Sequence, residues 1–211
     1  IVVVKQMFGG IGQNFVNPAL TARIVLMSSF PSAMSTWSKP FYYLEGTSDA
    51  LTTASPLGIL KEGTGAALPS YLDLFLGNNA GCLGETCALA LLLGGVYLIA
   101  RRVIHPAVPL CYLATVAVIS AVAGRDALTD LLTGGLMLGA IFMATDYVTR
   151  PVTKKGQYIY GVILGFLTAI FRIFGASAEG VSYAIILGNL LVPLIERYTM
   201  PKAFGKGGER S

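Results

Sequence analysis

Most of the second half of the chain consists of apolar segments separated by short polar ones. A helix that crosses a bilayer needs about 20 mostly apolar residues, and these segments approach that length. Because they follow one another through short connections, the pattern predicts an all-α, polytopic transmembrane helix bundle. The predicted spans are residues 85–100, 106–123, 127–148, 158–174 and 181–194.

The start of the chain has the pattern of a broken transmembrane helix, over residues 1–31. The apolar run 1–8 ends at Gly9-Gly10-Ile11-Gly12, and Asn17 then stands directly before Pro18. Asn is a good N-cap and Pro is favoured at the first helical position, so a second helix is predicted from Pro18 to about Phe30. Its positive dipole end and two carboxamides, Asn14 and Asn17, would face the gap.

A second glycine pair echoes the first. Gly134-Gly135 and the apolar run to Asp146 resemble Gly9-Gly10 followed by Asn17-Pro18. Paired interruptions indicate an inverted repeat with a ligand site between the halves, although chance pairing among 25 glycines explains the match equally well. The chain opens on Ile1-Val2-Val3-Val4-Lys5, which has the pattern of a helix end, without Met or a cleavable signal. We therefore expect a fragment whose N-terminal part is absent, with half of an inverted repeat within it.

Composition and charge support a membrane protein and orient it. The 211 residues are 54% hydrophobic and only 12% charged, with a mean hydropathy of +0.67, whereas soluble domains carry about 25% charged residues. With a cytoplasmic tail at 199–211 and spans over 84–198, the basic residues gather on the cytoplasmic side, as the positive-inside rule requires. Those residues are Lys5, Arg101, Arg102, Arg150, Lys154 and Lys155, against Lys39, Lys61 and Arg125 in the opposite loops. The net charge of +4 therefore indicates membrane orientation and no nucleic-acid partner.

The polar insertion 32–83 is thereby placed outside the cytoplasm. It contains Ser48-Asp49-Ala50-Leu51-Thr52-Thr53-Ala54-Ser55-Pro56-Leu57, a run rich in hydroxyl groups. Taken alone, such a run is typical of a turn.

Metal or nucleophilic chemistry has little support. The single His105 lies beside two arginines, and no group of Cys, His, Asp or Glu has ligand spacing. A disulfide between Cys82 and Cys87 is one interpretation of the cysteines, but small apolar residues are the favoured one.

Charged residues inside apolar segments are costly and need partners. Arg23 either faces an anionic group in the gap or, as we favour, pairs with a carboxylate, and Arg172 lies near the end of span 158–174. Glu85 would open its helix, with a structural or an ion-handling role. Asp146 is either an interfacial cap or a ligand of a cation or cofactor.

Five short motifs resemble, in order and over essentially the whole chain, one known family. It comprises the D subunit of the Rnf ferredoxin:NAD oxidoreductase complex and the B subunit of the sodium-pumping NADH:quinone reductase. The motifs are GGIGQNFVNPAL (9–20), DALTTAS (49–55), GCLGET (81–86), FMATD (142–146) and EGVSYA (179–184). The short loop after Ser55 and the brief tail favour the Rnf member of the family.

The resemblance implies that FMN is joined by a phosphoester to Ser55, where the family usually has Thr. Thr53 or Thr52 is the alternative, and Asp49 and Ala54 belong to the same motif. In the quinone-reductase relative, a noncovalent riboflavin is implied near the positions of Asn14 and Asn17.

The resemblance further implies a flavoprotein subunit that relays electrons in the bacterial inner membrane. Partner subunits with a second flavin and iron–sulfur centres would pass electrons from ferredoxin to NAD while sodium ions or protons move outward. The alternatives are the B-type quinone-reductase subunit and a channel or carrier without redox chemistry.

Overall fold

The chain folds mainly into helices, as a computed structural model shows for residues 1–7, 10, 14–38, 52–53, 55–62, 69–82, 84–175 and 180–201. The predicted all-α class is confirmed. In order, the helices are η1 (Val2–Gln6), α1 (Pro18–Ser29), α2 (Pro31–Ser35), α3 (Pro56–Glu62), α4 (Tyr71–Leu76), α5 (Ala88–Ala100), α6 (Ala107–Val122), α7 (Ala127–Leu132), α8 (Leu136–Leu138), η3 (Gly139–Met143), α9 (Lys154–Phe174) and α10 (Gly180–Thr199). Two-residue strands β1 (Trp37–Ser38) and β2 (Thr52–Thr53) pair antiparallel.

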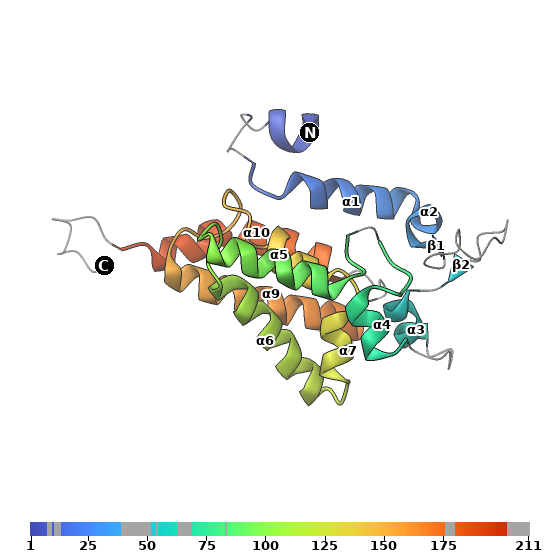
Figure 1. The fold of residues 1–211 in the computed structure, drawn as a ribbon. Coiled ribbons are helices and arrows are strands. Elements are labelled where there is room, and N and C mark those ends of the chain that lie inside the picture. Colours follow the sequence, from blue (N-terminus) through green and yellow to red (C-terminus); the bar gives the residue numbers. More distant parts are fainter. Residues whose placement is uncertain are drawn as a thin grey trace.

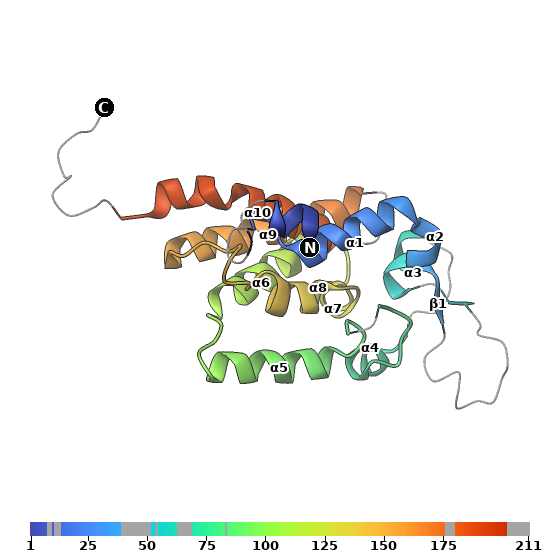
Figure 2. The same ribbon diagram turned by 90° about the horizontal axis from the view of Figure 1, so that it is seen from above.

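Helix α9 is the centre of the bundle. It packs between α6 and α10, and Figure 2 shows α10, α9, α6 and α5 one after another across the molecule. Gly161 and Gly165 let α9 approach the backbone of α6, because a methyl group at Gly165 would lie 2.9 Å from the carbonyl oxygen of Tyr112. Small residues four apart are a common means of close packing between membrane helices.

Two of the described helices, α9 and α10, are long and apolar enough to cross a membrane, while α5 and α6 are shorter apolar helices. The predicted span 106–123 matches α6 within one residue. Helix α9 begins earlier than predicted, at Lys154, because Thr153 caps it by accepting from the N–H of Gly156 at 3.1 Å. Helix α10 runs through Pro193 to Thr199, beyond the predicted end at 194.

Two predicted helices need correction. Glu85 does not open a helix, because Gly84 adopts a left-handed turn (φ +89°) and α5 begins at Ala88, capped by the Cys87 sulfur. Cys82 and Cys87 form no disulfide. The predicted span 127–148 is interrupted, since α7 ends at Leu132 and the chain turns at Gly134 (φ +65°) before α8.

The predicted start of α1 is confirmed. Asn17 Oδ1 accepts from the N–H groups of Ala19 and Leu20 at 3.0 and 3.3 Å, with Pro18 at the first helical position. The residues of the preceding glycine motif, except Gly10 (φ +87°), lie outside the described residues.

The two ends of the bundle differ in the elements that they contain. Helices α3, α4 and α7 lie at one end, and the end of α5, the start of α9 and the end of α10 lie at the other (Figure 1). Arg101 and Arg102 follow α5, and Arg150 and Lys154 precede or begin α9, so these basic residues share the second end.

Candidate functional site

The break at Gly134-Gly135 is where four separate parts of the chain meet. A methyl group at Gly134 would lie 3.2 Å from both Leu57 Cδ2 of α3 and Arg172 Nη2 of α9. One at Gly135 would lie 2.7 Å from Glu85 Oε2. Glycine is therefore required here by close contact as well as by the left-handed backbone at Gly134.

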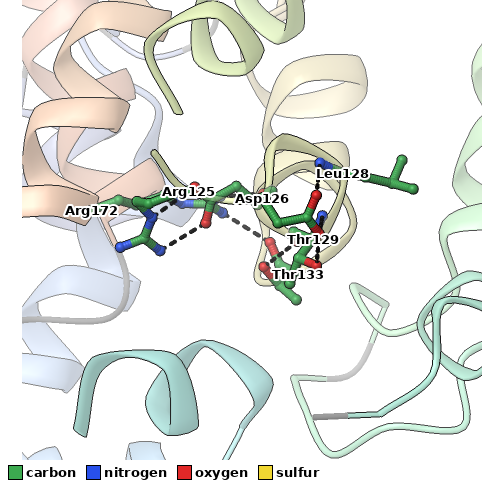
Figure 3. A network of polar contacts seen from close by, with 7 residues as sticks. Arg125, Asp126, Leu128, Thr129, Thr133 and Arg172 are labelled. Carbon is green, nitrogen blue, oxygen red and sulfur yellow. Dashed lines mark hydrogen bonds and ion pairs between the residues drawn. The ribbon is translucent and has the colours of Figure 1, made fainter. Parts of the chain in front are cut away.

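Arg172 fixes the end of α7. Its side chain is almost fully buried, and its guanidinium donates to the carbonyl oxygens of Asp130 and of Thr133, the latter at 2.9 Å (Figure 3). A cation at the C-terminal carbonyls of a helix is favourable because it complements their partial negative charge.

The beginning of α7 is held by a second arginine. Arg125 donates to both carboxylate oxygens of Asp130, at 2.9 and 2.8 Å, and Asp130 is itself 2% exposed. Bidentate pairs of this kind fix orientation as well as distance. The buried carboxylate of Asp130 is thus paired with a cation rather than isolated.

Asp126 ties α7 to α4. It caps α7 through the N–H groups of Leu128 and Thr129 and accepts from the Tyr71 hydroxyl of α4 at 2.9 Å. Hydrogen bonds from the Thr129 hydroxyl and then from Tyr71 lower the pKa of Asp126 below its usual value. Helix α4 is in this way attached to α7.

Glu85 and Arg23 form an ion pair beside Gly135 of the break. Arg23 Nη2 of α1 lies 3.6 Å from Glu85 Oε2, and both side chains are largely buried. Glu85 Oε1 also accepts from the N–H of Cys82 at 3.1 Å. This is the carboxylate pairing favoured from the sequence for Arg23. A cofactor contact of Arg23 and an ion-handling role of Glu85 stay predictions.

Ser55 lies at the start of α3, close to this break. Its Oγ accepts from the N–H of Gly58 at 3.2 Å and its carbonyl from Ile59, so Ser55 caps the helix. Two residues on, Leu57 is 5% exposed and contacts the break. Thr52 and Thr53 belong to β2, and Asp49 and Ala54 lie outside the described residues.

The two predicted carboxamides lie at the start of α1. Asn14 is buried, and the N–H of Asn17 donates to the side-chain oxygen of Asn189 on α10 at 3.2 Å. With the Asn189 side-chain oxygen directed at Asn17, the side-chain nitrogen of Asn189 donates to the Tyr160 hydroxyl at 2.6 Å. The second half of the broken helix is thus anchored by polar groups of α9 and α10.

Asp146 hydrogen-bonds locally, after η3. Its carboxylate accepts from the N–H of Val148 and from the hydroxyl of Thr149, both at 3.3 Å. These contacts close a local turn, and the interfacial cap set out from the sequence stays a prediction. Coordination of a cation by Asp146 stays a prediction.

Comparison with known proteins assigns the family. Residues 1–205 match the model of the NQR2, RnfD, RnfE family. The chain belongs to this family. It is 49% identical over 207 residues to the D subunit of a Na⁺-translocating ferredoxin:NAD⁺ oxidoreductase complex of Acetobacterium woodii, covering 97% of this chain and 64% of the relative. It is 42% identical to the D subunit of a proton-translocating ferredoxin:NAD⁺ oxidoreductase complex of Clostridium ljungdahlii, covering 97% and 66%.

A third relative, the D subunit of an ion-translocating oxidoreductase complex of Stutzerimonas stutzeri, is 38% identical, covering 96% of this chain and 66% of the relative. The chain therefore spans slightly less than two thirds of the length of each of these curated relatives.

Sequence reasoning missed part of the site in this member of the NQR2, RnfD, RnfE family. It noted Gly134-Gly135 only as an echo and gave Arg172 no role, and it did not single out Asp130 or Thr133. The available signals were an arginine inside an apolar helix and a glycine pair inside an apolar run. Neither signal identifies partners 39 to 42 residues away.

Proposed function

We propose that this chain is the subunit that relays electrons within a membrane-bound, ion-translocating ferredoxin:NAD⁺ oxidoreductase, with FMN joined to Ser55 by a phosphoester. The main support is the 49% identity, over 97% of the chain, to the D subunit of such a complex. The other subunits of the complex, with a second flavin and iron–sulfur centres, are its partners.

The surroundings of Ser55 fit a phosphoester. Its Oγ acts as a hydrogen-bond acceptor toward the N–H of Gly58, so the hydroxyl proton, which ester formation removes, is not needed for the cap. The residue is half-buried, which leaves part of it exposed for attachment. The flavin would supply transfer of one or two electrons, while Leu57 keeps the attachment point against the bundle.

The arrangement of charge supports a multi-pass protein of the bacterial inner membrane. Basic residues around 101–102 and 150–155 share one end of the bundle, and α3 and α4 lie at the other (Figure 1). By the positive-inside rule the basic end is cytoplasmic. The attachment loop is then outside the cytoplasm, and the C-terminus is inside.

Mass spectrometry of the peptide covering residues 40–62 tests the proposal directly. In the purified complex we expect the mass of an FMN phosphoester on Ser55, and fluorescence of this chain on a denaturing gel under ultraviolet light. Ser55→Ala should abolish both signals, Ser55→Thr should keep them because Thr also offers a hydroxyl, and Thr53→Ala serves as the matched control. A wild-type chain without flavin would contradict the electron-relay function and favour a channel or carrier.

The electron donor separates the two redox alternatives. We expect the purified complex to reduce NAD⁺ with reduced ferredoxin. Oxidation of NADH with a quinone, without ferredoxin activity, would instead assign the chain to the quinone-reductase branch.

A further inference from the structure

We propose that Arg172 is a positioning residue for the flavin attachment point, acting on Ser55 through the Gly134-Gly135 break and Leu57. The inference rests on the proposed function, since it concerns the group attached to Ser55. It assigns a role to a residue of α9 that lies outside the attachment loop.

The first step runs from α9 to the break. Helix α9 is held closely by α6 and α10, and Arg172 stands in its last turn. Its guanidinium donates to two main-chain carbonyls, those of Asp130 and Thr133, at the end of α7 (Figure 3). A planar fork with two donors sets the direction of the chain as well as its distance, which a lysine ammonium cannot do.

The second step runs from the break to α3. Gly134 follows Thr133 directly, and the position of its missing Cβ is 3.2 Å from both Arg172 Nη2 and Leu57 Cδ2. Leu57 is 5% exposed, so its side chain is closely packed. Because close-packed groups transmit displacement, a shift of the break moves Leu57.

The third step runs from Leu57 to Ser55. Ser55 caps α3, and Leu57 lies in the first turn of this helix. The Ser55 Oγ and carbonyl oxygen accept hydrogen bonds from the N–H groups of Gly58 and Ile59, which closes this turn. Movement of Leu57 therefore displaces the Ser55 oxygen that would bear the phosphoester. Groups at a functional site need support of this kind from the residues behind them.

Arg172→Lys in the full complex tests the proposal, because it keeps the charge and loses the fork. We expect the amount of covalent flavin per copy of the chain to fall about tenfold, because a small misplacement of the Ser55 oxygen strongly slows the attachment reaction. The midpoint potential of the remaining flavin should also shift. Arg101→Lys, at the opposite end of the bundle, is the matched control and should change neither. A structural role alone would lower the amount of chain in the membrane and leave flavin per copy and potential unchanged.

Leu57→Ala provides a second test that removes no buried charge. We expect it to shift the potential in the same direction as Arg172→Lys, and a double-mutant cycle with Gly134→Ala should show non-additive effects, because the two residues touch. Flavin per copy and potential equal to wild type in both Arg172→Lys and Leu57→Ala would overturn the inference. A wild-type chain without flavin would instead overturn the proposed function.

Discussion

Glu85 is a buried carboxylate whose charge partner, Arg23, comes from a different part of the chain. The 3.6 Å pair lies beside Gly135, where any side chain would strike the carboxylate. Removing one member of a buried pair leaves the other charge unpaired, whereas replacing both with apolar residues is often tolerated.

Arg23→Leu should therefore destabilise the protein by about 3 kcal/mol, and Arg23→Leu combined with Glu85→Leu should cost less. Thermal unfolding of the purified full chain in detergent measures both. A double variant less stable than Arg23→Leu would show that Glu85 is stabilised chiefly by its bond to the Cys82 N–H.

Local signals identified individual residues well where the partners are near in sequence. Asn17 was predicted as an N-cap because it precedes Pro18, and its bonds reach only to Ala19 and Leu20. The contacts of Arg172 could not be predicted, because they depend on how α9 packs beside α7. The sequence indicated that Arg23 pairs with a carboxylate, but it did not indicate that this carboxylate is Glu85.

At the scale of elements, the glycines of α9 decide how closely α6 approaches. A methyl group at Gly165 would lie 2.5 Å from Thr115 Cβ and 2.9 Å from the Tyr112 carbonyl oxygen. Backbone cannot move aside as a flexible side chain can, so the contact leaves no space for a larger residue.

Gly165→Ala should destabilise the bundle by about 1–3 kcal/mol through overpacking. Gly94→Ala in α5 is the matched control, because its nearest neighbour is the ring end of Phe142, which is partly exposed. Unfolding midpoints of the two variants in detergent provide the comparison. Equal midpoints would contradict the role assigned to the α6–α9 contact.

Apolar pattern predicted the existence of the helices better than their continuity. The 106–123 segment is one helix, whereas 127–148 is divided because Gly134 adopts a left-handed turn and Thr133 gives its carbonyl to Arg172. A glycine pair in an apolar run is compatible with a helix or a break. Only the tertiary contacts of Glu85, Leu57 and Arg172 decide between them.

At the scale of the whole molecule, the two ends of the bundle should face opposite sides of the membrane. Leu72 of α4 and Val152 before α9 are both highly exposed and lie at opposite ends. They therefore offer a matched pair of positions for labelling.

Leu72→Cys should react with a membrane-impermeant maleimide added to intact cells, and Val152→Cys should react only after the membrane is opened. The three natural cysteines are replaced by serine in both variants, since serine also caps helices. Reaction of Val152→Cys alone in intact cells would reverse the proposed orientation.

The close packing of α9 also has a mechanical consequence. Glycines on α9 contact α6, and Gly188 of α10 packs against Leu164 of α9, so sliding between these helices would create clashes. Helices α6, α9 and α10 are thus expected to move as one rigid unit. Leu57 of α3 and Glu85 of the turn before α5 pack against Gly134-Gly135, and Arg172 of α9 holds the carbonyl of Thr133 directly before this pair. A displacement of α3 or of that turn is therefore resisted by the same unit.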